Sequence, residues 1–335
     1  MFLLPWHLFF SFLHLSWEHN IRILARHQSH LCCLPRAMGT TMDYDALLAR
    51  FDDLVAREII YYFPPTTIRL NDAGFAFEFQ ISPSLRTKPA SIGDTFQSGD
   101  SASPKGFGPG SDIANTDPNL VITIINHTHL LVINKFPVFR PQLLLLTCDS
   151  YRRQHEPLTV EDFAAIQSVL SSSKERHLVI YNCGPIAGAS RNHKHVQILP
   201  RPAHLFPDDP NCDPEWIPFR YGLRYLGGPD FEDPEYPSQL SASYQELLAE
   251  AKGSPRSSAD SNNAGYFPHN VALVREWIIV IPRCSNNFKA ISANAAGMMG
   301  SVWLKSEEEL DRWKQVGLSK ALAGLGYPRE SEKTS

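Results

Sequence analysis

The sequence predicts an α+β protein built around a mostly antiparallel sheet that helices flank. Short runs of β-branched and aliphatic residues follow one another over 120–147, which suggests three neighbouring strands in a meander. Segments with helical periodicity stand before these runs, after them and again near the end of the chain. This mixed order of helices and strands favours the α+β class.

Composition limits the kinds of protein that the chain can be. Its 335 residues correspond to roughly two domains or one large one. Hydrophobic residues make up 43% and charged residues 20%, which is typical of a soluble globular protein. The formal net charge of -4 would repel a nucleic-acid backbone at long range, so we expect no nucleic-acid partner.

The cysteines and the N-terminal segment indicate neither a metal ribbon nor a membrane anchor. No C-x-x-C pair occurs among the six cysteines, so a zinc ribbon and a thioredoxin-type site are unsupported. Residues 2–17 are apolar, but the stretch is short for a membrane span and has no basic segment before it. We expect residues 1–41 to be an unstructured or non-native extension that lies outside the fold.

The first half of the fold is predicted element by element. Residues 43–60 carry apolar side chains at helical spacing, and residues 74–81 alternate strictly as a strand does. Residues 91–119 are rich in Gly, Ser, Asp and Pro, which predicts a long, flexible, solvated loop. Three strands are expected within 121–127, 129–138 and 142–147.

The next elements surround a glycine-rich turn. Residues 159–172 predict a helix in which Thr159 is the N-cap and Asp162 completes a capping box. Residues 177–182 and 195–199 predict strands on either side of the turn.

The last part of the chain combines irregular and regular segments. Residues 200–237 are crowded with prolines and aromatics and predict a long ordered excursion, and residues 253–265 predict a second flexible insertion. Strands are expected at 271–276 and 277–283. One helix is expected over 306–324, with Ser306 and Glu309 forming a capping box.

One stretch in the middle of the chain contains candidate catalytic residues. In an extended strand, His193, His195 and Gln197 project from one face while Lys194 and Val196 project from the other. The preceding turn, residues 188–190, has little side-chain bulk, so its backbone N–H groups can approach an anion and cradle a phosphate.

An H-x-H tripeptide alone is more often a core or surface pair, or half of a metal site, than a nucleophile. The small-residue turn and Gln197 favour catalysis, because a neutral amide can donate to a phosphoryl oxygen without acting as a base toward water. A histidine at that position would favour hydrolysis, whereas a glutamine preserves an intermediate for another acceptor.

The string GASRNHKHVQ at 188–197 resembles the histidine-triad-like superfamily, specifically the diadenosine tetraphosphate phosphorylases, also called ATP adenylyltransferases. Other segments match the same family in the same order, and together they run from about residue 44 to 328. They are PSL-x-x-KP at 83–89, INKFPV at 133–138, NVALV-x-x-W at 270–277 and SANAAG at 292–297, continuing to Lys305.

The resemblance implies a histidine-triad-like fold, with a catalytic part at about 42–205 and a C-terminal part at about 206–330. It implies that His195 is the nucleophile, that Gln197 holds the α-phosphate and that His193 orients the site or binds a phosphate. The nucleotide contacts that it implies are Lys88, Asn134, Lys135, Asn182, Gly188, Ala189, Ser190, Arg191, Gln197, Asn294, Ala295, Ala296, Ser301 and Lys305. Arg191 replaces the usual Gln, and Ser301 stands where a Met is expected near the base.

The implied activity is phosphorolysis of diadenosine tetraphosphate (Ap4A) by phosphate, which gives ADP and ATP through an adenylyl-histidine. An ADP-forming sulfate adenylyltransferase activity is an additional possibility. A divalent cation, expected to be Mg²⁺, would accompany the polyphosphate, with no organic cofactor and no metal site of the protein's own. The resemblance places the protein in the cytoplasm, with the nucleus as a second location, and implies no membrane partner.

Three alternatives stay open at this point. A histidine-triad nucleotidyl hydrolase and a hexose-phosphate uridylyltransferase use related motifs, although the missing paired cysteine ligands and the match over 292–305 argue against the uridylyltransferase. A nucleotide-binding stress module that has lost catalysis is the alternative from another class. Incubation with Ap4A, with and without phosphate, distinguishes these alternatives by their products.

Overall fold

The computed structural model describes residues 42–88, 106–228, 232–253 and 265–329, which all belong to one compact unit, Met38–Ser335. The predictions for residues 1–41, for 91–105 and for most of 253–265 lie outside the described residues. Within the described ranges, no helix is long and apolar enough to cross a membrane.

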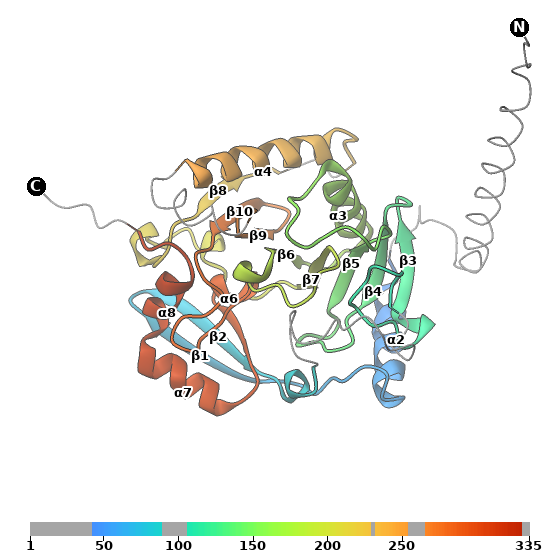
Figure 1. Ribbon diagram of the computed structural model, residues 1–335, viewed down its shortest axis with the longest axis horizontal. Coiled ribbons are helices and arrows are strands. Elements are labelled where there is room, and N and C mark those ends of the chain that lie inside the picture. The colour runs from blue at the N-terminus through green and yellow to red at the C-terminus, as the bar shows by residue number, and fades with distance from the viewer. Residues whose placement is uncertain (1–41, 89–105, 229–231, 254–264, 330–335) are drawn as a thin grey trace, which may run out of the picture. The chain divides into compact units, whose positions relative to one another are not determined.

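An eight-stranded sheet in the order β3-β4-β5-β7-β6-β9-β10-β8 forms the centre of the fold, and every neighbouring pair is antiparallel (Figure 1). The predicted class and the predicted meander of β3, β4 and β5 are therefore confirmed. The strands are β3 (Val121–Ile125), β4 (His129–Ile133), β5 (Leu143–Thr147), β6 (His177–Cys183), β7 (His195–Pro200), β8 (Gly222–Tyr225), β9 (His269–Leu273) and β10 (Trp277–Pro282).

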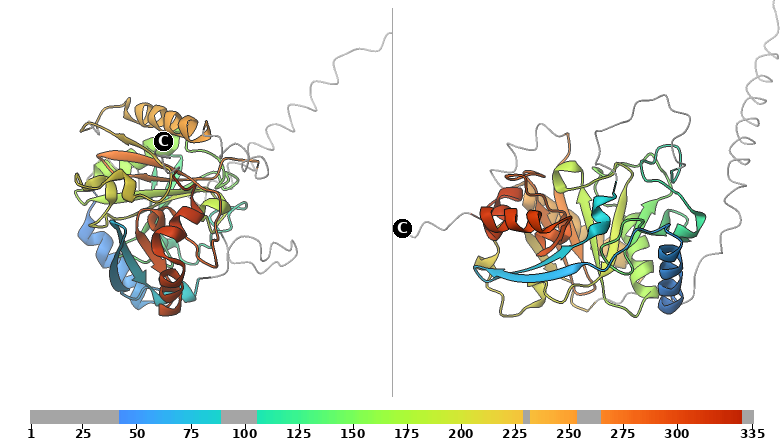
Figure 2. Two further views of the ribbon diagram at one scale, coloured as in Figure 1. Left: turned by 90° about the vertical axis from the view of Figure 1, so that its left-hand side faces the viewer. Right: turned by 90° about the horizontal axis from the view of Figure 1, so that it is seen from below.

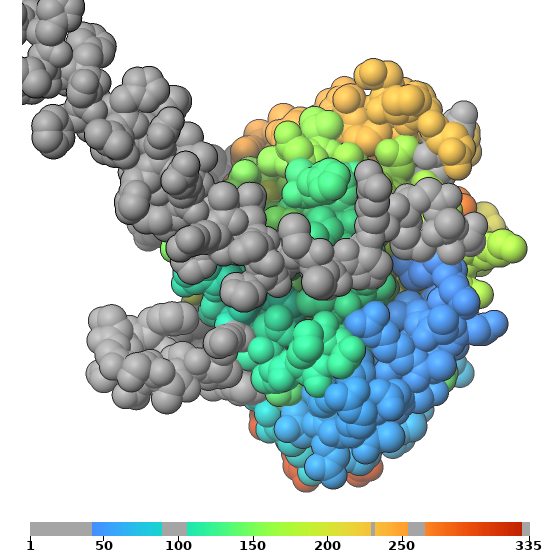
Figure 3. Space-filling view, turned by 90° about the vertical axis from the view of Figure 1, so that its right-hand side faces the viewer, coloured from blue at the N-terminus to red at the C-terminus, as the bar shows by residue number. Residues whose placement is uncertain are grey.

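Three helices cover one face of this sheet: α2 (Tyr44–Ala56), α3 (Val160–Ser172) and α4 (Tyr236–Lys252). The capping box of α3 is present as predicted, with Thr159 and Asp162 bonded to each other's backbone amides. Figure 3 shows α2 (blue) beside the teal segment that holds β3 and β4. Arg50 of α2 fixes this contact by donating to the main-chain oxygens of Asn119 and Val121, at 2.6 Å in each case.

A second layer covers part of the opposite face. It contains β1 (Thr66–Asp72), β2 (Phe75–Ile81) and β11 (Ser301–Leu304), with β11 parallel to β2, and the helices α6 (Ala295–Met298), α7 (Glu307–Val316) and α8 (Leu318–Leu325) (Figure 2). Aromatic side chains of β2 pack with Trp313 of α7 and with residues of β6, β9 and β10 in one apolar cluster. This layer covers the β6–β10 half, so the corresponding face of β4, β5 and β7 is left for other residues.

The predicted helix over 306–324 is wrong as a single helix, because it consists of α7 and α8. Gly317 separates them with φ +93, a left-handed conformation that side-chain-bearing residues avoid. The predicted capping box at Ser306 is also wrong, since the Ser306 side chain makes no cap bond. The Glu309 carboxylate instead accepts the N–H of Lys305 at 2.7 Å.

The predicted excursion over 200–237 contains two short 3-10 turns and β8, the edge strand. The 3-10 segments of the described chain are Pro83–Arg86, Pro118–Leu120, Pro185–Ala187, Phe206–Asp208 and Pro214–Trp216.

Candidate active site

A cavity of about 380 Å³ lies against the uncovered face of β4, β5 and β7. Its wall combines polar and charged side chains with the apolar side chains of Phe107, Ile113, Val132 and Phe136. Seven of the residues that the sequence singled out line it together, namely Lys88, Asn134, Lys135, Ser190, Arg191, His195 and Gln197. A wall of this composition can contact both an aromatic ring and anionic groups.

His195 is the first residue of β7, and its ring is oriented by a main-chain contact. Its Nδ1 lies 2.8 Å from the carbonyl oxygen of His193. Because a carbonyl can only accept, Nδ1 carries the proton and Nε2 keeps its lone pair. Nε2 makes no hydrogen bond to any described residue, and the side chain lines the cavity.

Gln154 bonds to both main-chain polar groups of His195. Its side chain accepts the N–H of His195 at 2.8 Å and donates to the carbonyl of the same residue at 2.9 Å. It also donates to the carbonyl of Asn182 at 3.1 Å, so it bridges the ends of β6 and β7 where their pairing stops. The nucleophile candidate is therefore fixed on a rigid strand.

Burial, together with the nearby His193 and Lys88, lowers the pKa of His195 to about 4. The imidazole is thus neutral throughout the physiological pH range. A neutral imidazole with a free Nε2 lone pair is the form that can attack phosphorus.

His193 does not line the cavity, although the sequence pattern placed it on the same face as His195. Its side chain is fully buried, and its Nε2 lies 2.9 Å from the carbonyl oxygen of Thr147. That carbonyl requires the proton on Nε2, so Nδ1 accepts from the hydroxyl of Ser111 at 2.8 Å. His193 therefore acts on the site through its own carbonyl, which orients His195.

Three positively charged side chains, Lys88, Lys135 and Arg191, line the cavity. Lys88 donates to the Ser190 hydroxyl at 3.0 Å, and burial together with Arg191 and Lys305 lowers its pKa to about 8. Lys135 donates to Thr116 at 3.2 Å and lies 5.3 Å from the ring centre of Tyr61. This concentration of cations suits a polyphosphate, although the whole chain is acidic.

The small-residue turn packs directly against the start of α6. Gly188 has φ +88, and a Cβ there would lie 2.8 Å from the carbonyl oxygen of Ala293. Only glycine allows this approach. The turn and Asn294, the N-cap of α6, share a smaller hollow of about 170 Å³.

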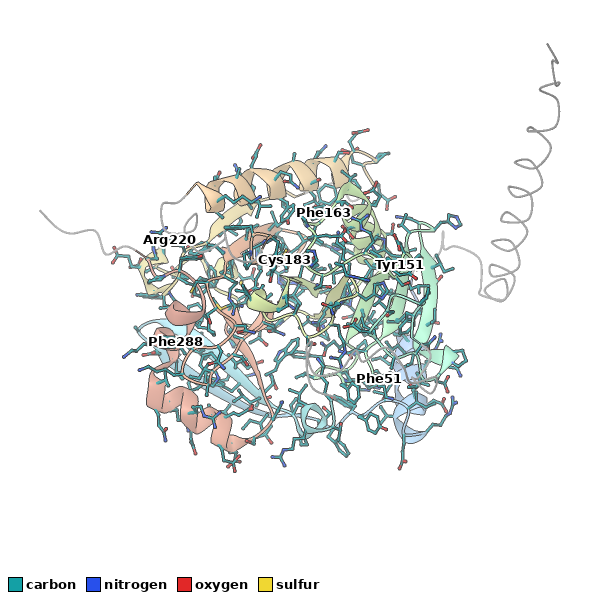
Figure 4. The ribbon with its side chains drawn as sticks, viewed as in Figure 1. Phe51, Tyr151, Phe163, Cys183, Arg220 and Phe288 are labelled. Atoms are coloured by element: carbon teal, nitrogen blue, oxygen red, sulfur yellow. The ribbon has the colours of Figure 1, made fainter. Side chains whose placement is uncertain are left out.

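A buried network joins this turn to the C-terminal half. The side-chain oxygen of Asn182 accepts from the Asn270 amide at 2.9 Å and from the Ala295 N–H at 2.8 Å. Arg283 donates to Asn270 at 2.6 Å and to the carbonyl of Ala293 at 2.9 Å. The network lies at the end of β6, which Cys183 marks in Figure 4.

The remaining predicted contacts lie outside the main cavity. Asn182, Ala295 and Ala296 are buried, and Ala189 follows Gly188 in the turn. Ser301 is buried in β11, where its hydroxyl has no hydrogen-bond partner among the described residues. Lys305 is exposed at the end of β11, near enough to Lys88 to affect its pKa.

Part of the site wall comes from a segment in which the sequence pattern predicts only a solvated loop. The described part of the predicted solvated loop, 106–119, is not free in solvent, since Phe107 is 8% exposed and lines the cavity. Asp112 accepts the N–H groups of Asn192 and His193 at 2.6 and 3.0 Å. Ser111 and Asp112 of this segment thus bond to the residues just before β7, which composition alone does not reveal.

Among the described residues, no group of three or more His, Cys, Asp or Glu side chains could hold a metal ion. A larger hollow of about 530 Å³, near Phe219 and Arg329, contains none of the predicted site residues. The candidate site residues that line the main cavity together are those around His195.

Comparisons with known proteins identify the family of the chain. Residues 64–211 match the family described as Ap4A phosphorylase N-terminal domain, and residues 215–328 match the ATP adenylyltransferase C-terminal domain. The chain is 28% identical to diadenosine 5′,5‴-P1,P4-tetraphosphate phosphorylase 2 of Saccharomyces cerevisiae over 281 residues, 74% of this chain and 82% of that protein. It is 29% identical to Protein APA1 of the same yeast over 231 residues, 62% of this chain and 71% of that one.

Solved structures show the same fold. The crystal structure of yeast Ap4A phosphorylase Apa2 in complex with AMP matches with a TM-score of 0.68 at 23% identity, covering 87% of this chain and 100% of that chain. The Apa2 structure in complex with Ap4A matches with a TM-score of 0.66 at 22% identity and with the same coverage. The resemblance read from the sequence is confirmed, and the chain belongs to the Ap4A phosphorylase and ATP adenylyltransferase family of nucleotidyltransferases.

Proposed function

We propose that the protein cleaves Ap4A with inorganic phosphate to give ADP and ATP through an adenylyl group on His195. The observation that carries the proposal is the bond between Nδ1 of His195 and the carbonyl of His193 at 2.8 Å, which leaves the Nε2 lone pair at the cavity. The family relationship supports the same reaction.

The reaction has two balanced steps. Nε2 attacks the α-phosphorus, a P–N bond forms, and the bond from that phosphorus to the bridging oxygen breaks, which releases ATP. An oxygen of inorganic phosphate then attacks the same phosphorus, the P–N bond breaks, and ADP leaves. Lys88 and Arg191 offset phosphate charge as it shifts between the two leaving groups.

Gln197 keeps the intermediate for phosphate. Its amide can bind an α-phosphate oxygen but cannot take a proton from water, so Gln197 supplies no general base beside the adenylyl group. This feature favours a transferase over the hydrolase alternative.

The cation belongs with the substrate in this proposal. Asp112 is the only carboxylate lining the cavity among the described residues, and its two oxygens already accept main-chain N–H groups. The site therefore offers no cage for Mg²⁺, and we expect the ion to arrive bound to the polyphosphate.

Separation of the products tests the proposal. The protein is incubated with Ap4A alone, with phosphate and with sulfate, and ATP, ADP and AMP are quantified. Phosphate-dependent ADP in equal amount to ATP supports phosphorolysis, whereas AMP formed without phosphate indicates a hydrolase. Absence of all products with intact nucleotide binding supports the non-catalytic module, and adenylyl sulfate with the sulfate sample identifies the second acceptor.

A further inference from the structure

Gln142, which the family motifs do not include, lies directly behind Gln197. It precedes β5, its side chain is 1% exposed, and it does not line the cavity. Its main-chain carbonyl also accepts the N–H of Asn134 at 2.9 Å, so the residue is held against the segment that forms one cavity wall.

The two ends of the Gln142 amide can be told apart by their partners. The N–H of Val138 donates to Oε1 of Gln142 at 2.8 Å. Because a backbone N–H can only donate, the oxygen of the Gln142 amide must face Val138, and its NH₂ group must face the other way. That group donates to Oε1 of Gln197 at 2.8 Å.

This arrangement determines the direction of the Gln197 amide. Its oxygen is engaged by Gln142, so its NH₂ group is the end that remains for the cavity, where it makes no hydrogen bond to a described residue. The reversed amide would set two NH₂ groups against each other and turn a lone pair toward the phosphate oxygens.

We propose that Gln142 is a positioning residue that holds the NH₂ group of Gln197 toward the α-phosphate. The inference rests on the proposed function, since it assigns how one group of that site is aimed. Gln142 touches no reacting atom in this assignment and acts through Gln197.

The substitution Gln142→Glu tests the proposal because it keeps the shape of the side chain. It replaces the NH₂ group by an oxygen that carries a proton only at low pH. The ionised carboxylate still accepts from Val138, but it can only accept from Gln197, whose amide must then reverse. The protonated carboxyl donates its O–H to Oε1 of Gln197 and restores the native direction. Activity relative to wild type should therefore fall about ten- to a hundredfold near pH 8.5 and recover as the pH approaches about 5.5.

The ratio of variant activity to wild-type activity at each pH isolates the effect of the substitution at residue 142. The charged and titratable groups that line the cavity are Lys88, Asp112, Lys135, Arg191 and His195, and both proteins contain all of them. His195, with a pKa of about 4, stays neutral over the whole range, so the wild-type nucleophile does not titrate.

Gln142→Met is the matched control. Methionine fills a similar volume but neither donates, accepts nor titrates, so its activity relative to wild type should be reduced by the same factor at every pH. Thermal unfolding of each variant confirms that the assays report folded protein.

The experiment measures kcat/KM with Ap4A and phosphate, and in parallel the affinity for AMP by calorimetry. AMP affinity tests the direction of the Gln197 amide even if the wild type shows no turnover. Absence of turnover would refute the proposed function but not the positioning role. The positioning role is refuted if Gln142→Glu keeps the wild-type values at both pH extremes, or if Gln142→Met shows the same pH-dependent recovery.

A measurement on the wild-type protein covers the case in which the variants do not fold. NMR of the side-chain amides should show slow solvent exchange for Gln142 with and without AMP. The Gln197 amide protons should exchange fast in the free protein and become protected when AMP binds. Fast exchange of Gln142 would contradict the proposal.

Discussion

The main-chain oxygen of His193 lies 2.8 Å from Nδ1 of His195. The first histidine of the H-x-H motif therefore contributes backbone to the site, while its own ring is held by Thr147 and Ser111. The spacing of two residues matters because it brings this carbonyl to the ring of His195. The two histidines therefore contribute different groups, a main-chain carbonyl from His193 and an imidazole ring from His195. The H-x-H pattern alone does not distinguish them.

Replacing the proposed nucleophile should abolish turnover and leave binding intact. His195→Ala removes the group that forms the covalent bond, so turnover should fall by at least about a thousandfold while AMP still binds. Product formation and calorimetry provide the two measurements, with exposed His127→Ala as the control at the wild-type rate. Near-normal turnover by His195→Ala would disprove the assignment.

The pH profile of kcat/KM should be unusually broad on its acid side. His195, with a pKa of about 4, loses its lone pair only as the pH falls through that value, not near 6.5. Lys88 has a pKa of about 8 and loses its charge as the pH rises, so kcat/KM should decline above that value. In Lys88→Arg the decline should move to higher pH, because arginine stays charged. An unmoved alkaline limb would exclude Lys88 as its origin.

Asp112→Asn should lower both activity and stability. The carboxylate accepts two main-chain N–H groups beside the histidine strand, whereas an asparagine oxygen replaces one acceptor and its NH₂ group opposes the other N–H. We expect kcat to fall about tenfold and the free energy of unfolding to fall by about 1–2 kcal/mol. Steady-state kinetics and urea unfolding measure the two effects. Exposed Asp53→Asn in α2 is the control, and equal behaviour of the two variants would argue against a role for Asp112.

Arg283→Met should destabilise the fold. The guanidinium is 1% exposed and has no carboxylate partner among the described residues, and its donors bind main-chain carbonyls and Asn270. Removing it leaves several buried acceptors unpaired, so the free energy of unfolding should fall by about 3 kcal/mol. Denaturant unfolding measures this loss. Arg224→Met breaks only exposed ion pairs with Glu246 and Glu250 and should cost less than about 1 kcal/mol.

Gln197→His should change the products. An imidazole on this face of β7, about 7 Å along the strand from His195, can protonate a leaving group and then activate water. Phosphate-dependent ADP should decrease and AMP should form instead, as chromatography of the nucleotides would show. An unchanged ratio of ADP to AMP would indicate that exclusion of water, and not Gln197, preserves the intermediate.

Local patterns predicted the strands and the first helices well, because their signals depend on neighbours in the chain. Alternation placed Gln197 on one face of β7 and Val196 on the other, and Val196 indeed packs in the helix-side core. The capping box at Thr159 needs only four residues and is present. Ser306 has the same pattern, but Glu309 bonds to Lys305 instead, so the pattern alone does not decide which amide is capped.

Contacts between distant residues could not be predicted from patterns. Asp112 lies in a stretch with loop composition, and only the fold brings it to His193. Lys194 would be expected at the surface, yet it is 2% exposed and pairs with Asp162 of α3 at 2.7 Å. Gln142 and Gln154 bond to residues that are distant in the sequence, and such contacts leave no periodic signal.

The position of β6 between β7 and β9 affects how the chain folds during translation. Every residue of β6 is buried, but its partner β9 is encoded far downstream, after α4. While the ribosome is still adding that intervening segment, β6 has one unpaired edge of apolar residues. An open edge of this kind readily pairs with another chain. The nascent protein therefore exposes the open edge of β6 until β9 is added in the last quarter of translation.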